Sequence, residues 1–238
     1  MKKIIVIAAS SIVALSAVSA SAQQITGGEA SITYSAFSDN TDLSATSLDA
    51  SLEFGISREL GLQLDMGSRS FNTADETAQN YVLHGIYNTS ESVSLGVFYG
   101  IDRLDGENAD IYGLEMGAEM GALDLEAYWA RGDLDSDTGD GFGIAGRTKL
   151  ANGTTLGLRY ESVDFGGVLE LSNFAVEADY AISDTVSLNA SYGTAEWVAG
   201  GTTILDEPFF AIGATFTFGA ERGTTFGKRS VFSILPGA

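Results

Sequence analysis

The sequence predicts an all-β protein, a transmembrane antiparallel β-barrel of about 12 strands, from three observations. Apolar and polar residues alternate with a period of two over most of the chain, as in strands with one apolar face. Short connections alternate with longer, acidic ones. Two prolines and 29 glycines in 238 residues suit long hydrogen-bonded strands.

The first 22 residues have the pattern of a secretory signal peptide. Two lysines precede an apolar stretch that runs to Val18, and Ala20-Ser21-Ala22 supplies the small residues that signal peptidase requires. The apolar stretch is too short to span a bilayer. We therefore expect Sec-type export and cleavage after Ala22, with an uncleaved N-terminal anchor as the alternative.

The strands are predicted from their alternating faces. Four weaker segments, at 30–37, 79–87, 142–150 and 154–160, complete the set of 12. The apolar faces of the eight clear segments are, in chain order, Leu48, Ala50, Leu52, Phe54 and Ile56; Leu60, Leu62, Leu64 and Met66; Val93, Leu95, Val97, Tyr99 and Ile101; Tyr112, Leu114, Met116, Ala118 and Met120; Leu123, Leu125, Ala127 and Trp129; Phe174, Val176, Ala178 and Tyr180; Val186, Leu188, Ala190 and Tyr192; and Phe210, Ile212, Ala214, Phe216 and Phe218.

The connections predict which end of the barrel is which. Asn152-Gly153 is the preferred dipeptide of a two-residue hairpin turn. With an even number of strands, both termini lie at the end with the short turns, which is the periplasmic end of such barrels. Short links are expected at 57–59, 88–91, 121–122, 151–153 and 182–184, and longer ones at 39–42, 70–76, 103–109, 131–140, 164–170 and 194–207.

A secreted β-sandwich would show the same periodicity with its apolar face turned inward. The placement of the aromatic residues favours the barrel, because they gather near both ends of the strands, as at the two interfaces of a bilayer. Trp129, Tyr99, Tyr112 and Tyr192 are expected towards the longer links, and Phe54, Tyr87, Tyr180 and Phe218 towards the short turns.

Over residues 23–218 the chain resembles the Gram-negative outer-membrane porin family, especially the small porins of alphaproteobacteria. The hairpin strands carry the resemblance, for example Leu60-Gly61-Leu62-Gln63-Leu64-Asp65, together with the closing strand Phe210–Phe218. It implies the outer membrane of a Gram-negative bacterium, contact with its lipid and lipopolysaccharide, insertion by the barrel-assembly machinery, and small solutes as cargo. A homo-oligomer is left open. The chain departs from the family in continuing for 20 residues beyond Phe218.

The charged residues that alternate with the apolar face are predicted to face the lumen, because Arg or Lys at mid-depth on the lipid side costs about 2–4 kcal/mol. Opposed acidic and basic walls would create a transverse field. The alternative is that the charges pair within a filled lumen. The predicted pore-lining residues are Asp49, Glu53, Asp65, Arg69, Glu115, Asp124, Glu126, Arg147, Lys149, Arg159, Glu161, Glu177 and Asp179.

Residues 219–238 form a C-terminal tail with a basic character that the rest of the chain lacks. Arg222, Lys228 and Arg229 are candidates for a plug that folds back from the periplasmic end into the acidic lumen. The alternative is an extension into the periplasm.

Enzymatic chemistry is not expected. His84 is the only histidine, and its neighbours on the same strand face are Val82 and Ile86, so we interpret it as structural. No cofactor motif or metal site is expected either: the acidic run from Asp133 starts like a calcium-binding loop but has Thr138 where that loop needs glycine.

Charge decides the expected cargo. The chain has 12 basic and 32 acidic residues, and loss of the two N-terminal lysines leaves a net charge of −22. Such a protein repels nucleic acid and attracts cations. The sequence therefore predicts a porin-like channel for passive diffusion of small hydrophilic solutes with a preference for cations. The alternative is a non-conducting structural or surface-interaction barrel.

Overall fold

A computed structural model describes residues 24–73, 76–134, 137–219 and 223–235. The expected signal peptide, residues 1–22, and the plug candidate Arg222 lie outside these ranges. Within the described ranges, no helix has the length and apolar character needed to cross a membrane.

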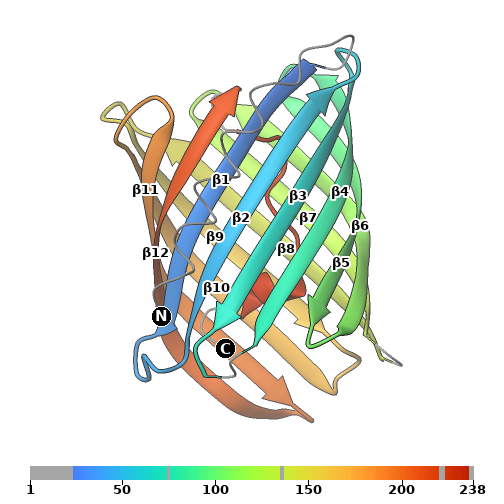
Figure 1. The fold of residues 1–238 in the computed structure, drawn as a ribbon, viewed down its shortest axis with the longest axis vertical. Coiled ribbons are helices and arrows are strands. Elements are labelled where there is room, and N and C mark those ends of the chain that lie inside the picture. Colours follow the sequence, from blue (N-terminus) through green and yellow to red (C-terminus); the bar gives the residue numbers. More distant parts are fainter. Residues whose placement is uncertain (1–23, 74–75, 135–136, 220–222, 236–238) are drawn as a thin grey trace.

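Twelve strands form a closed barrel in which every neighbouring pair is antiparallel and β12 pairs with β1 (Figure 1). This confirms the predicted fold class and strand number. The elements are β1 (Gln24–Phe37), β2 (Ser44–Gly55), β3 (Leu60–Phe71), β4 (Thr77–Ser90), β5 (Val93–Leu104), β6 (Glu107–Met120), β7 (Leu123–Leu134), β8 (Asp137–Lys149), β9 (Thr154–Asp164), β10 (Leu169–Ala181), β11 (Val186–Ala199), β12 (Thr202–Gly219) and one short 3-10 helix, η2 (Val231–Ile234).

The seam between the first and last strands closes the ring. It runs in unbroken register from Gly27 opposite Gly219 to Phe37 opposite Phe209. A closed ring pairs the backbone groups of both edge strands, which a sheet in hydrocarbon requires because no water is present to bond them.

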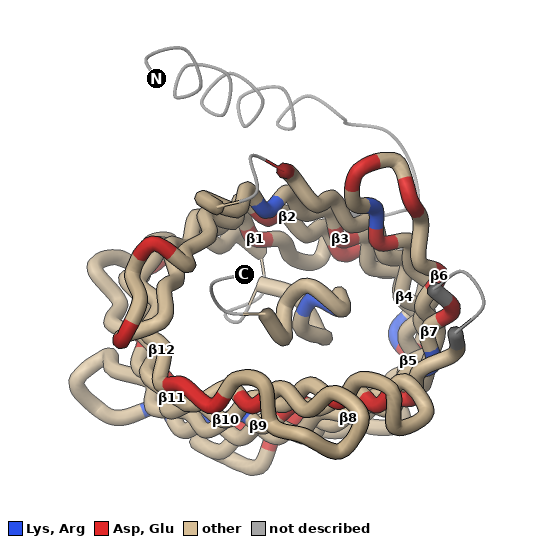
Figure 2. Tube along the Cα trace, turned by 90° about the horizontal axis from the view of Figure 1, so that it is seen from below, with Lys and Arg blue, Asp and Glu red and all other residues tan. Residues whose placement is uncertain are grey.

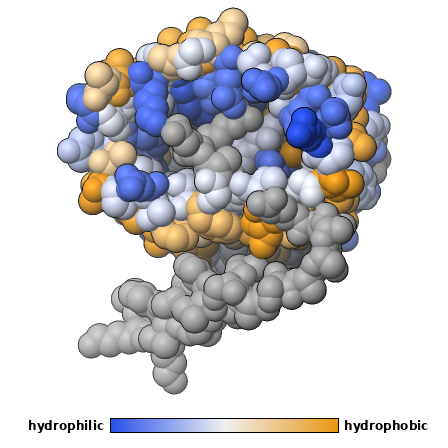
Figure 3. All heavy atoms as spheres, turned by 90° about the horizontal axis from the view of Figure 1, so that it is seen from above, coloured by the Kyte–Doolittle hydropathy of each residue, from blue (hydrophilic) through white to orange (hydrophobic). Residues whose placement is uncertain are grey.

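The alternation of side chains places the apolar face outside. On β6, Leu114 and Met116 are 59% and 48% exposed, whereas Glu115 between them is 4% exposed. Figure 3 shows apolar residues on the flank of the molecule and polar residues around the end that carries the short turns. Buried residues therefore lie inside the barrel, and the large exposed apolar residues form its outer surface.

The connections at the two ends of the barrel differ less in length than the sequence predicted. The longer links expected at 103–109 and 194–207 are almost entirely strand. Two-residue turns, Asp105-Gly106 and Gly200-Gly201, join these strands, and all four residues have positive φ angles. Such residues form two-residue turns that match the twist of the flanking strands. The polar residues there belong to strands that continue the hydrogen-bonded ladder, so composition alone overestimated the loops.

The chain re-enters the barrel after β12. In Figure 2, which looks along the barrel from the end opposite the short turns, a segment with basic residues lies inside the ring of strands. We call residues 223–235 the C-terminal segment. It begins beside Gly28 and Glu29 of β1 and ends with η2, which contacts β9 and β10.

The outward apolar face gives a direct test. Replacing Leu114 with arginine puts a charge into the middle of the lipid-facing surface and is expected to lower the free energy of unfolding by about 2–4 kcal/mol. Ser191→Arg, on the inner face of β11, is the matched control and should cost less than about 1 kcal/mol. Urea unfolding in lipid vesicles measures both. Equal losses would contradict the orientation.

Candidate functional site

The wall of the lumen supplies hydrogen bonds to the backbone of the C-terminal segment. Thr225 N donates to Glu53 Oε2 at 2.7 Å, and Gly227 N donates to Glu126 Oε1 at 2.9 Å. An extended chain inside a barrel leaves its backbone groups unpaired unless side chains bond them. The wall carboxylates meet this need, which explains how the segment can lie in the lumen without pairing as a strand.

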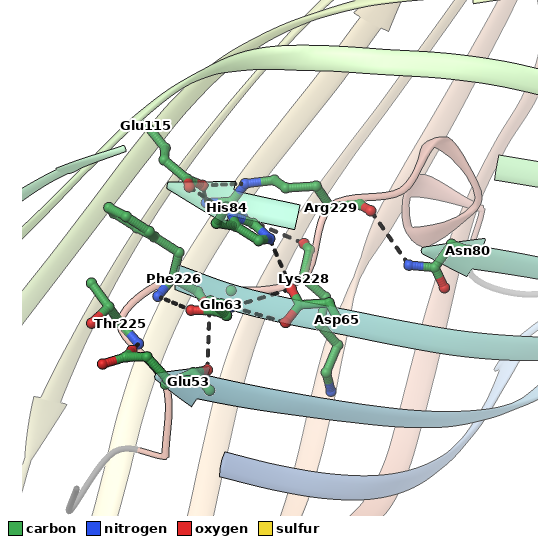
Figure 4. A network of polar contacts seen from close by, with 12 residues as sticks. Glu53, Gln63, Asp65, Asn80, His84, Glu115, Thr225, Phe226, Lys228 and Arg229 are labelled. Carbon is green, nitrogen blue, oxygen red and sulfur yellow. Dashed lines mark hydrogen bonds and ion pairs between the residues drawn. The ribbon is translucent and has the colours of Figure 1, made fainter. Parts of the chain in front are cut away.

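Gln63 of β3 binds both backbone groups of Phe226 (Figure 4). Its Nε2 donates to Phe226 O at 2.8 Å, and its Oε1 accepts from Phe226 N at 3.1 Å. The Phe226 ring stacks on His84, with ring centroids 6.3 Å apart. A wall amide thus holds the segment as a neighbouring strand would.

Arg229 is the buried basic centre of the site. Its Nη2 lies 3.0 Å from Glu115 Oε2 on β6 and also bonds Glu126 Oε1 on β7. Its guanidinium carbon stands 4.2 Å from the centre of the Tyr128 ring. A guanidinium with two carboxylates and an aromatic face is bound on several sides at once.

Val82 and Ile86 do share the inward face of β4 with His84, but the expectation drawn from β4 alone missed two carboxylates from other strands. Both ring nitrogens contact carboxylates, Nε2 with Asp65 Oδ2 at 3.0 Å and Nδ1 with Glu115 Oε1 at 2.7 Å. An imidazole that donates from both nitrogens carries a positive charge. The error arose because Glu115 reaches His84 across β5, where Gly96 leaves room: a Cβ there would come within 2.6 Å of the Glu115 side chain.

Lys228 extends to a different wall from Arg229. Its Nζ lies 3.0 Å from Glu29 Oε1 on β1 and 3.9 Å from Asp49 Oδ2 on β2. Consecutive residues of the segment therefore bind β1–β2 and β6–β7, which lie far apart around the ring. The segment spans the lumen at this level.

A cavity of about 1870 Å³ remains beside the segment. We call it the passage. Its walls are mainly β7 to β12, β1 and the segment itself. It is lined by ten of the predicted pore-lining residues and both described plug candidates: Asp49, Arg69, Asp124, Glu126, Arg147, Lys149, Arg159, Glu161, Glu177, Asp179, Lys228 and Arg229.

Acidic and basic groups interdigitate on one wall of the passage. Arg159 bonds Glu161 on its own strand at 3.1 Å and Glu177 on β10 at 2.9 Å. Arg147 lies 3.8 Å from both Glu126 and Glu177. The expected transverse field between opposed walls is therefore not what the geometry provides, because neighbouring strands β7 to β10 bring both signs together.

Glu53, Asp65 and Glu115 point into the barrel but do not line the passage. The C-terminal segment covers them, and Asp65 and Glu115 are almost fully buried. Their role in the structure is to bind Thr225, His84 and Arg229.

Several contacts of the segment were absent from the sequence prediction. Asp102 Oδ2 accepts from Val231 N at 2.6 Å, Asn80 Nδ2 donates to Arg229 O at 3.5 Å, and Gln63 pairs with Phe226. The alternation of apolar and polar residues does turn Gln63, Asn80 and Asp102 into the lumen. Their partners in the C-terminal segment lie more than 100 residues away in the sequence, so no local pattern could identify these contacts.

A closed barrel with an apolar exterior and a charged interior defines an outer-membrane channel protein. The chain belongs to the Gram-negative porin family, whose model matches residues 60–198. It is thus a porin of the Gram-negative outer membrane. Among curated proteins, none matches the sequence at a significant level.

Solved structures of porins share the fold. The KdgM porin in complex with disordered oligogalacturonate is 10% identical, covers 80% of this chain and 99% of its own, and has a TM-score of 0.60. The NanC porin is 10% identical, covers 79% of this chain and 98% of its own, and has a TM-score of 0.62. At this identity the likeness concerns the fold alone.

The contacts of Arg229 predict a large effect of its removal. Arg229→Met takes from the buried Glu115 and Glu126 the cation that they share, which is expected to cost about 3–5 kcal/mol and to release the segment. Trypsin cleavage after Lys228, followed by mass spectrometry, should accelerate strongly. The same exchange at Arg131, whose ion pair with Asp140 is about half exposed, should change stability by less than about 1 kcal/mol and leave Lys228 protected. Similar protection in the two variants would contradict the assigned role of Arg229.

Proposed function

We propose that this porin allows passive diffusion of small hydrophilic cations along the passage beside the C-terminal segment. The lining supports a preference for cations: among the described residues, nine carboxylates and six basic groups line the passage, a net charge of −3. Fixed negative charge in a narrow polar pore lowers the barrier for cations and raises it for anions.

The basic groups on one wall of the passage are paired with carboxylates. Arg147 and Arg159 are each shared between two carboxylates, so their charge is largely compensated within the wall. Asp124 and Asp179 lie within three residues of the short turns, at the periplasmic end of the passage. A cation that enters from that end meets these carboxylates together with Lys149 at the end of β8.

The C-terminal segment limits the width of the passage in this proposal. Its own Lys228 and Arg229 bind carboxylates on opposite walls, and the segment itself forms one side of the passage. It thereby takes the place of an inward-folded constriction loop. The alternative function, a non-conducting barrel, predicts no current steps at all in a planar bilayer.

Selectivity is tested by removing lining charge. Asp124→Asn combined with Asp179→Asn reduces the net charge of the lining from −3 to −1, so the permeability ratio of K⁺ to Cl⁻ should fall about twofold or more. Reversal potentials in a salt gradient measure it. Asp39→Asn combined with Asp42→Asn, in the exposed connection between β1 and β2, is the control for total charge. A ratio unchanged in the lumen variant would count against the proposed selectivity.

The width limit is tested by ending the chain at Phe218. The β1–β12 seam pairs almost completely without the later residues, so the barrel should still close. Single-channel conductance is expected to rise several-fold because the segment no longer fills part of the lumen. Conductance equal to that of the full-length protein would refute the narrowing.

A further inference from the structure

The end of the lumen opposite the short turns is lined by apolar side chains, which is unexpected in a polar pore. We call this the outer apolar layer. It consists of inward-facing wall residues and of residues from the C-terminal segment: Phe37, Phe71, Val163, Leu171, Trp197, Phe209, Phe232, Ile234 and Leu235.

The C-terminal segment joins the wall parts of this layer. Phe232 packs against Phe71 of β3, with ring centroids 6.4 Å apart. Ile234 packs between Val163 of β9 and Leu171 of β10. Two bonds to the backbone fix the crossing: Arg69 of β3 donates to Leu235 O, and Asn173 of β10 donates to Ile234 O at 3.2 Å. Strands β3 and β10 lie far apart around the ring, so the segment spans the lumen a second time.

The passage ends where this layer begins. Its lining starts at the short turns, with Leu123 and Ile182 among the residues, and extends as far as Asn173, Phe209 and Phe232. Ile234, Val163 and Leu171 lie beyond it and are almost fully buried. The lining of the passage therefore runs from the short-turn end to the packed apolar side chains of this layer.

We propose that Phe232, Ile234 and Leu235 are the gate of this channel, closing its outer end by excluding water. The inference rests on the proposed function and assigns to particular residues the control of passage. Ions do not enter an apolar constriction that water has left, so a few packed side chains suffice to stop conduction. Opening requires that η2 withdraws from β9 and β10 and that the bonds from Arg69 and Asn173 to its last residues break.

Unpartnered polar atoms surround the closed gate. Asn173 Oδ1, Trp197 Nε1 and Glu207 Oε2 are buried and have no hydrogen-bond partner among the described residues. Asn173 and Glu207 both stand in register with Ala195 of β11, on the strands to either side. These polar atoms are hydrogen-bonding partners for water that enters on opening.

The gate can move without releasing the segment. The Arg229 contacts with Glu115 and Glu126 precede η2, and Ser230 stands between them as the N-cap of η2, its Oγ accepting from Phe232 N at 3.1 Å. The ion pairs hold the segment in the lumen while the turn that follows changes position.

Polar substitutions test the gate in the full-length protein. Val163→Thr replaces a methyl group of the gate contact by a hydroxyl, and Ile234→Thr replaces an ethyl group by a hydroxyl. Both should wet the contact and raise the mean current in planar bilayers several-fold. Ile234→Val has the shape of Ile234→Thr without the hydroxyl and should behave as the unchanged protein. Equal currents for Ile234→Thr and Ile234→Val would overturn the proposal.

A cysteine probe separates failure of the gate from failure of the channel. The chain contains no cysteine, so Asn189→Cys introduces a single thiol in the passage. A charged methanethiosulfonate reagent should modify it rapidly only from the short-turn side, and from both sides once Val163→Thr is added. Rapid modification from both sides without Val163→Thr overturns the gate but leaves the channel. Absence of current in every variant overturns the proposed function itself.

Discussion

The absence of water from the hydrocarbon core is the constraint on which this structure depends. It requires each backbone group of a spanning strand to find a partner within the protein, which the ring from β1 to β12 provides. Once the ring is closed, the pleat of the strands determines where each side chain points: every second residue faces lipid and the others face the lumen. Leu114 and Glu115, adjacent in the chain, therefore lie in opposite environments.

A second constraint on the structure is the repulsion between carboxylates in the lumen. A strongly acidic chain concentrates carboxylates inside a narrow cylinder, where like charges repel each other at short range. Arg229 and Lys228 compensate this charge at its centre, while Arg147 and Arg159 do so on the wall. The C-terminal segment thus acts as an internal counter-ion, and it leaves a net negative lining along the passage.

The sequence predicts the barrel well because the signal for it is local. Period-two alternation in segments such as Leu60–Met66 indicates both the strand and its outward face from the residues alone. The site depends on contacts that no alternation encodes. Asp65, His84 and Glu115 come from three strands and meet only because Gly96 leaves a gap between them. Likewise, Phe71, Val163 and Trp197 face inward against the expectation of a polar lumen, because apolar residues of the C-terminal segment cover them.

The attachment of the C-terminal segment to β12 has a consequence for biogenesis. Its partners are distributed over the whole circumference, with Lys228 bound to β1 and β2, Arg229 to β6 and β7, and Ile234 to β9 and β10. No partly assembled sheet offers all of them. The full set of contacts can form only after the last strand has joined the first. Completion of the docked segment is therefore a late step in the assembly of each newly inserted molecule.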